Sequence, residues 1–139
     1  MGVLPDDWTL PALDPLNEAW FTSGKLLVQQ CPDCGELTHP PEEICAACGS
    51  LKRTHRELSP TGTIHSYTVA HYAVNRALAD AIPYAVILVS LDDAPQVRVI
   101  GNLLGAPPEA IEIGMRVVAE WEERVVDGET IRLPQWRLA

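Results

Sequence analysis

Four cysteines, arranged as two Cys-x-x-Cys pairs, are the residues of this 139-residue chain best suited to chemistry. Cys31 and Cys34 are separated from Cys45 and Cys48 by a ten-residue spacer, and a glycine follows each pair. This spacing lets a tight turn place two thiolates on one face of a tetrahedron, and the second pair supplies the other two. Because four thiolates leave no open coordination position, the pattern predicts a structural Zn²⁺ site rather than a catalytic one. A disulfide pair and a redox-active Cys-x-x-Cys are the alternatives.

The composition narrows the classes of protein to consider. The chain carries 10 Lys and Arg against 19 Asp and Glu, a formal net charge of −9. This acidic balance argues against a nucleic-acid-binding protein, which needs a basic face for the phosphates. The sequence contains neither a signal-peptide pattern nor an apolar run of membrane-spanning length, so we expect no membrane association. We expect a cytoplasmic protein, because a reducing compartment favours metal binding over disulfides for paired cysteines.

Lys52, Arg53, His55 and Arg56 form a basic cluster directly after the second cysteine pair. One interpretation is a solvated strand face. The functional interpretation is an anion site, in which Lys52, Arg53 and Arg56 contact the phosphates of a coenzyme A nucleotide.

The first residues of the chain form an apolar, proline-containing arm with Trp8 and Leu10. This arm packs on its own domain or lies on a partner protein, because Trp and Leu side chains are common at interfaces. Trp8, Leu10 and Trp136, in the last predicted strand, are our candidates for partner contact. A short helix of about 8–10 residues is predicted from Asp14-Pro15, with Gly24 as its C-terminal stop.

The rest of the chain is predominantly β in character. Alternation of Leu26 and Val28 predicts a strand entering the first cysteine pair, and the turn at 59–62 is the expected hinge between ribbon and main domain. Five further strands are predicted at 63–72, 84–91, 96–104, 115–122 and 131–138, with helical turns at 73–82 and 107–111. We therefore predict a mainly β protein: arm, helix and zinc ribbon over 1–60, and a five-stranded OB-fold barrel over 61–139.

Four local features are predicted within the barrel. The continuous apolar run at 84–91 indicates a strand buried on both faces. Gly101 marks a bulge or a close approach of another backbone. Asp127-Gly128 predicts a hairpin turn, and the change of apolar face in the last strand predicts a bulge or bend at Pro134.

No catalytic constellation is apparent in the sequence. It lacks a Gly-x-Ser-x-Gly elbow, a P-loop and a Gly-x-Gly-x-x-Gly motif. His65 and His71 have no nearby carboxylate on their own strand. The adjacent acidic pairs at 92–93 and 122–123 point to opposite faces if they lie on strands, so they cannot act as a paired acid and base. The sequence therefore favours a protein that is not an enzyme by itself.

The order of these segments resembles a known family. The segments that carry the resemblance are LVQQCPDCGELTHPPEEICAACGS, SPTGTIHSYTVAH, PYAVILVSLDD, VIGNLLG, IEIGMRV and LPQWRLA. Over about residues 15–139 the chain is similar to the acyl-CoA-associated family that joins a rubredoxin-like zinc ribbon to an OB fold, long catalogued as a domain of unknown function. The family's zinc ligands correspond to the four cysteines. The loop at 73–82 lacks the Gly- and aromatic-rich character expected there.

The resemblance implies association rather than independent chemistry. Relatives accompany thiolase-like enzymes and hydratases. The version in steroid breakdown pairs with a sterol-carrier-type thiolase homologue, and that complex cleaves a side-chain β-hydroxyacyl-CoA by a retro-aldol reaction. The resemblance thus implies a non-catalytic subunit of a hetero-oligomer that stabilises a thiolase-like partner and shapes its acyl-CoA site. The alternatives are a stand-alone acyl-CoA-binding module, or a scaffold for a hydratase or for a thiolase and a hydroxymethylglutaryl-CoA synthase.

Overall fold

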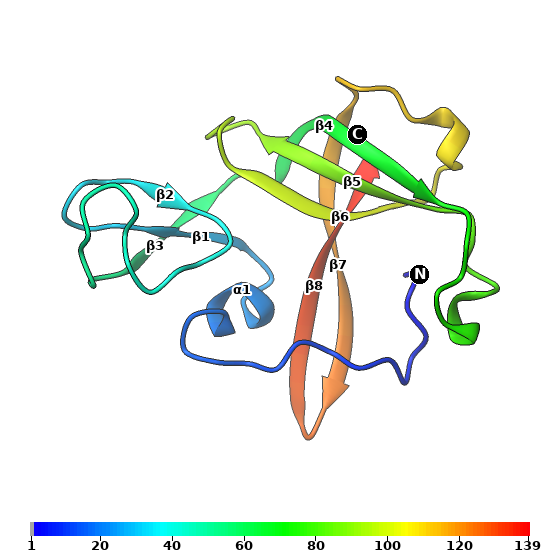
Figure 1. The fold of residues 1–139 in the computed structure, drawn as a ribbon, viewed down its shortest axis with the longest axis horizontal. Helices are drawn as coiled ribbons and strands as arrows, with labels where there is room; N and C mark the ends of the chain where they lie inside the picture. Colours follow the sequence, from blue (N-terminus) through cyan, green and yellow to red (C-terminus); the bar gives the residue numbers. More distant parts are fainter. Residues whose placement is uncertain (1) are drawn as a thin grey trace.

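The computed structural model describes residues 2–139 and consists of a small three-stranded sheet beside a closed five-stranded barrel (Figure 1). The small sheet has the order β2-β1-β3, and the barrel the order β4-β5-β6-β8-β7. The elements in chain order are α1 (Glu18–Thr22), β1 (Leu26–Gln30), β2 (Leu37–Thr38), β3 (Thr54–Leu58), β4 (Thr61–Ala70), η1 (Arg76–Leu78), β5 (Tyr84–Leu91), β6 (Arg98–Leu104), η2 (Pro108–Ala110), β7 (Arg116–Val126) and β8 (Glu129–Leu138). The prediction of a mainly β chain with a ribbon followed by an OB barrel is confirmed.

The small sheet carries the cysteine pairs and packs one face on the rest of the molecule. β1 runs antiparallel to both β2 and β3, and Leu26 lies opposite Leu58. Leu26, Val28 and Leu58 are buried in the hydrophobic core that also fills the barrel, as the alternation in β1 predicts. The chain passes from this sheet to the barrel between Leu58 and Thr61.

The barrel closes in the order expected of an OB fold. Its strands pair antiparallel except for β6 and β8, whose short parallel contact at Leu103 and Trp136 closes the sheet on itself. β4 changes register between Ile64 and Ser66, which allows a long strand to bend around the barrel.

β5 differs from its prediction as a strand buried on both faces. Ala85, Ile87, Val89 and Leu91 are at most 4% exposed and fill the barrel, but the alternate residues are only half-buried. The reason is that β5 lies in a single closed sheet, so one of its faces points out of the barrel. Val86 and Leu88 on the outward face are apolar nonetheless.

β8 approaches β6 closely at Gly101, and the pairing of β6 with β5 has no bulge at this residue. Its register with Ile87 is regular, and a Cβ at this position would lie 2.9 Å from the ring of Trp136 and 3.0 Å from the carbonyl oxygen of Pro134. Glycine is therefore required by the contact between β6 and β8. The predicted hairpin turn is confirmed, with positive φ values of 52° at Asp127 and 79° at Gly128.

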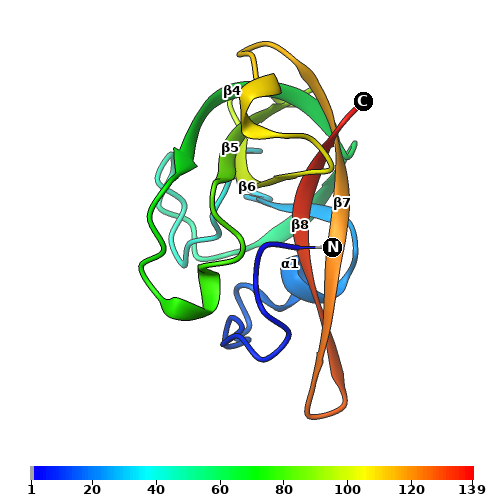
Figure 2. The same cartoon turned by 90° about the vertical axis from the view of Figure 1, so that its right-hand side faces the viewer.

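The bulge predicted at Pro134 is wrong. β7 and β8 keep one continuous register from Val117 opposite Leu138 to Val126 opposite Glu129. Beyond the barrel the two strands continue as a projecting hairpin (Figures 1 and 2), and the N-terminal arm covers the hairpin face opposite to that of Trp136. Ile131 is buried on that covered face, so the apolar face of β8 changes because different segments cover the two ends of the strand.

The N-terminal helix is shorter than predicted. The side chain of Asp14 does accept bonds from the backbone N–H groups of Leu16 and Asn17, at 2.8 and 2.9 Å, but the resulting turn precedes the five-residue α1. Gly24 ends the segment with a φ of 67°, as predicted. No helix in the part of the chain that the structure describes is long and apolar enough to span a bilayer.

Candidate functional site

The four cysteines converge into one cluster at the end of the small sheet. Their Sγ atoms all lie within 4.8 Å of one another, and Cys31 to Cys48 and Cys34 to Cys45 are both 3.6 Å. The two pairs have the same local geometry, because in each the glycine after the second cysteine donates its N–H to the carbonyl of the first cysteine, at 2.8 Å. Each of these turns requires a positive φ at its glycine.

The cluster fits a tetrahedral Zn²⁺ site. Zn–S bonds of about 2.3 Å imply separations of roughly 3.8 Å between sulfurs, close to the observed values. A disulfide needs about 2.05 Å, so these pairs are not disulfides. The backbone N–H of Cys34 donates to Cys31 and lowers the pKa of that thiol to about 7. At Cys34 the backbone N–H of Glu36 is outweighed by burial and the neighbouring cysteine side chains, which raise the pKa of Cys34 to about 12. All four protein positions are thiolates, so the site would be closed and structural.

His39 lies in the spacer between the pairs but is not part of the cluster. Its ring stacks on Trp20 of α1 at a centroid distance of 4.3 Å. Burial lowers the pKa of His39 to about 4, so the ring is neutral at physiological pH. The spacer histidine thus fastens the ribbon to α1.

The basic side chains after the second cysteine pair do not all lie on one face of the ribbon. Lys52 lies 4.0 Å from a carboxylate oxygen of Asp33, and Arg53 donates to the carbonyl of Glu43 at 3.1 Å. Arg53 and His55 share a small hollow of about 250 Å³, which Arg56 does not line. Strand alternation places Arg56 on the other face, where the hydrogen bond from Ser59 lowers the pKa of Asp93 and the charge of Arg56 lowers it further. Contact of these side chains with coenzyme A phosphates stays a prediction.

The three residues predicted to contact a partner differ in exposure. Trp8 and Leu10 are half-buried and line a hollow of about 580 Å³ between the arm and the β7–β8 hairpin. The prediction for Trp136 is wrong, since its side chain is 0% exposed in the barrel core. A surface contact is impossible there because β6 crosses directly over the ring at Gly101.

An apolar groove of about 650 Å³ lies between α1, the spacer and the barrel, and the sequence did not reveal it. Trp20, Phe21 and His39 form one wall, and Val86 and Ile100 on the outer face of β5 and β6 form another. The wall residues come from distant segments, so no local pattern marks them.

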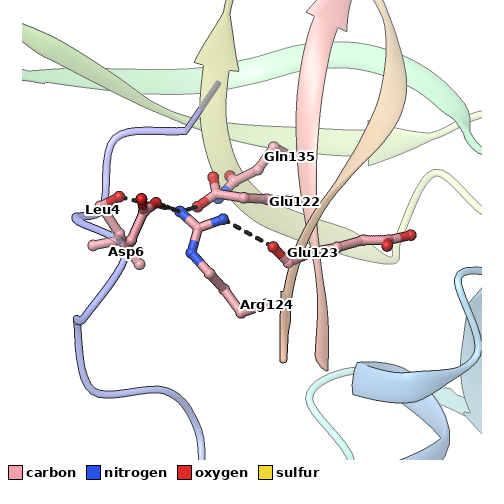
Figure 3. Close-up of polar contacts among 6 residues, drawn as sticks. All are labelled: Leu4, Asp6, Glu122, Glu123, Arg124 and Gln135. Carbon is pink, nitrogen blue, oxygen red and sulfur yellow. Dashed lines mark hydrogen bonds and ion pairs between the residues drawn. The ribbon is translucent and has the colours of Figure 1, made fainter. Parts of the chain in front are cut away.

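A buried polar cluster on the β7–β8 hairpin was also missed. Glu122 is 7% exposed and accepts a bond of 2.8 Å from Arg124 (Figure 3). Gln135 donates to the other carboxylate oxygen of Glu122 at 3.4 Å, and Arg124 also donates to the carbonyl of Leu4 in the arm at 3.1 Å. The cluster therefore joins the arm to the hairpin. The alternation of β7 residues predicts that Glu122 is exposed, on the face opposite to Trp121. This pattern gives no sign that the N-terminal arm covers that face.

Comparison with protein-family models gives two matches that follow one another along the chain. Residues 22–52 match the ChsH2 rubredoxin-like zinc ribbon domain, and residues 55–122 match the ChsH2 C-terminal OB-fold domain. The first match contains all four cysteines, which confirms the predicted structural zinc site.

Several proteins of known description are similar to this chain. A probable enoyl-CoA hydratase alpha subunit of Thermomonospora curvata is 40% identical over 132 residues, 93% of this chain and 39% of the relative. The 3-oxo-4,17-pregnadiene-20-carboxyl-CoA hydratase alpha subunit of Mycobacterium tuberculosis is 29% identical over 97% of this chain and 42% of its own length. The chain thus spans about two fifths of these two relatives. A DUF35 domain-containing scaffold protein of Methanocaldococcus jannaschii is 31% identical over 75% of this chain and 72% of the relative.

Solved structures agree with these matches. A chain of the Ltp2-ChsH2(DUF35) aldolase superposes with a TM-score of 0.78 at 38% identity, covering 93% of this chain and 98% of that one. A DUF35-family protein of unknown function from Sulfolobus solfataricus shares the fold, with a TM-score of 0.56 at 17% identity. The chain therefore belongs to the ChsH2 branch of the DUF35 family, in which a rubredoxin-like zinc ribbon precedes an OB-fold domain.

Proposed function

We propose that this protein is the non-catalytic subunit of a hetero-oligomeric carbon–carbon lyase, in which it stabilises a thiolase-like partner of the sterol-carrier type and shapes its acyl-CoA site. The reaction of the complex is the retro-aldol cleavage of a β-hydroxyacyl-CoA side chain, as in steroid or lipid degradation. The observation that carries the proposal is the similarity to a chain of the Ltp2-ChsH2(DUF35) aldolase along nearly the full length of both chains. We propose a cytoplasmic location for the complex.

The polar side chains also support a structural role. Asp92 binds Arg116 through two hydrogen bonds, Asp93 accepts the N–H of Ser59, and Glu122 binds Arg124. Asp92 and Asp93 each hold one segment of the fold to another, and Glu122 also accepts a bond from Gln135 on the neighbouring strand β8. A carboxylate fixed in this way is poorly placed to move protons for a substrate.

Co-expression tests the proposal directly. The chain is co-expressed with a thiolase-like protein of the sterol-carrier type, and the pair is analysed by size-exclusion chromatography and by cleavage of β-hydroxyacyl-CoA thioesters. We expect a stable hetero-oligomer whose lyase activity requires both proteins. The proposal fails if this protein stays a monomer while the thiolase-like protein is soluble and fully active alone.

A scaffold for a hydratase is the second candidate, favoured by the names of the hydratase alpha subunits and of the archaeal scaffold protein. The same co-expression with a hydratase of the hot-dog fold distinguishes the two candidates. Calorimetry with coenzyme A thioesters tests the stand-alone binding module, because an isolated non-catalytic subunit does not need measurable affinity for them.

A further inference from the structure

The outer face of the barrel carries an apolar surface that the fold itself does not need. Leu88 lies opposite Ile100 and Val86 opposite Asn102, so Val86, Leu88 and Ile100 share the face that points away from the barrel core. Ile100 is 63% exposed, and the other two are half-buried. The inward residues of the same strands already fill the core, so these outward apolar side chains are available for another contact.

This face is continuous with the groove beside α1. Val86 and Ile100 line both the groove and a shallower hollow of about 220 Å³ that also contains Tyr67 and Leu88. We call the whole surface the β5–β6 band; it consists of Tyr67, Val86, Leu88 and Ile100 together with the groove walls Trp20, Phe21, His39, Pro40 and Pro41. It extends over several segments that meet only in the fold, α1 and the ribbon on one side and the barrel strands on the other (Figure 1).

The charges around the band indicate what would bind there. The spacer continues from Pro41 into the exposed Glu42 and Glu43, and Asp14 lies on the edge of the groove. Within residues 2–139 none of these three carboxylates forms an ion pair. The ribbon end of the band is therefore an apolar groove next to three carboxylates without an ion-pair partner, and the nearby Arg53 guanidinium bonds to the backbone carbonyl of Glu43 and not to a carboxylate.

We propose that the β5–β6 band is the docking surface for the partner subunit, and that the partner places an apolar side chain in the groove and a Lys or Arg side chain against Glu42 and Glu43. This inference rests on the proposed function, since it names the surface used by the same hetero-oligomer. A second copy of this chain is a poorer occupant, because it brings a further net charge of −9 toward the same acidic surface. A basic, apolar segment of a different protein matches both properties.

The experiment compares two isoleucines of similar exposure in the co-expressed complex. Ile100→Asp places a charge in the band, and Ile113→Asp places the same charge at a 68% exposed position outside it. We expect the dissociation constant for the thiolase-like partner to rise roughly tenfold or more for Ile100→Asp and to stay near the wild-type value for Ile113→Asp. Glu42→Lys combined with Glu43→Lys should also weaken binding and reduce its dependence on salt.

The possible outcomes separate the surface from the function. If the thiolase-like partner binds the wild-type protein and all three variants with the same affinity, the docking surface is overturned and the proposed function stays intact. A protein that binds no thiolase-like partner overturns both. Hydrogen exchange supplies a second measurement on the wild-type complex, in which β6 from Arg98 to Leu104 should gain protection. A wild-type homodimer that Ile100→Asp converts to a monomer would assign the band to self-association and overturn the proposal.

Discussion

Arg116 holds Asp92 with two parallel hydrogen bonds, each 2.7 Å long. Arg116 begins β7 and Asp92 directly follows β5, so the pair joins two barrel strands. Asp92 also accepts the hydroxyl of Thr61 at 2.6 Å, and the neighbouring Asp93 accepts the N–H of Ser59 at 2.7 Å. Two consecutive carboxylates therefore fasten the segment that connects the ribbon to the barrel, which the sequence predicts to be a hinge.

Because of this arrangement, the free energy of unfolding should depend on pH in the acid range. The bonds from Arg116 and Thr61 hold the pKa of Asp92 at about 2, below its ordinary value of 3.8. Because the folded pKa is depressed, the stabilisation is complete above about pH 4 and is lost as the pH falls toward 2. Asp92→Asn should therefore be less stable than the wild type at pH 7, and the difference should shrink below pH 4.

Denaturant unfolding at several pH values measures this difference. Glu57→Gln is the matched control, because Glu57 lies 3.8 Å from Lys25 in an ion pair whose side chains are both 59% exposed. Such an exposed ion pair contributes little to the free energy of unfolding. An Asp92→Asn variant as stable as Glu57→Gln at pH 7 would contradict the role given to the clamp.

The zinc site is expected to stabilise the ribbon rather than to catalyse. Cys45→Ser should lose the metal, unfold the ribbon and lower solubility, and partner binding should be lost with it. Structural Zn²⁺ binding is worth about 10–16 kcal/mol in isolated fingers, far more than the small buried face of this sheet can replace. Metal content by mass spectrometry and amide exchange over residues 26–58 measure the effect. A Cys45→Ser protein that stayed folded and metal-bound while the complex lost turnover would indicate a catalytic site instead.

The buried pair of Glu122 and Arg124 gives a prediction about the N-terminal arm. The side chains are 5% and 17% exposed, so removing one deprives the other, which is desolvated, of its nearest opposite charge. As an opposite charge Arg124 then keeps only the exposed Asp6, at 3.9 Å, and Glu122 keeps only the bond from Gln135. Either Glu122→Ala or Arg124→Ala should lower the free energy of unfolding by about 3–5 kcal/mol. The double variant should lower it by less than the sum of the two. Urea unfolding of all four proteins gives the coupling energy, and additive losses would show that the two side chains act independently. Proteolysis in the arm should accelerate in Arg124→Ala, which loses the bond to Leu4.

Local patterns in the sequence predict the elements of this fold well. Three features depend only on residues that are close in the sequence. They are the metal site from the cysteine spacing, strand β1 from the alternation of Leu26 and Val28, and the hairpin turn from Asp127-Gly128. The metal site is the clearest example, because a tight turn after each first cysteine needs only a glycine at the right distance.

Features that depend on contacts between distant segments could not be predicted in this way. Glu122 is buried because the arm, more than a hundred residues away in the chain, covers its strand face. The same arm accounts for the change of apolar face near Pro134, where β8 pairs with β7 but not with β6 and so tolerates a proline. The interior position of Trp136 likewise depends on β6 crossing it at Gly101.

The burial of Trp136 has a measurable consequence. Trp136→Ala should destabilise the barrel by about 3–5 kcal/mol, because it removes a large side chain from a fully buried position. Trp8→Ala, in the half-buried arm, should cost about 1 kcal/mol or less. Thermal unfolding of the two variants compares a core tryptophan with an arm tryptophan. Equal losses would contradict the different positions that the structure gives them.

The contact between His39 and Trp20 predicts a dependence of stability on pH near neutrality. Burial lowers the pKa of His39 from its ordinary 6.5 to about 4, so between these values the unfolded chain binds a proton that the folded chain does not. Proton uptake on unfolding means that stability falls as the pH decreases from about 6.5 toward 4. His39→Phe keeps an aromatic ring against Trp20 and removes the titration. In chemical unfolding experiments on the zinc-loaded proteins, the wild type should lose more stability than His39→Phe between pH 7 and pH 5. His71→Phe, at an exposed histidine in the barrel domain, is the control and should follow the wild type. If the wild type and His39→Phe show equal slopes, His39 is solvated in the folded protein and the groove wall carries a charge at low pH.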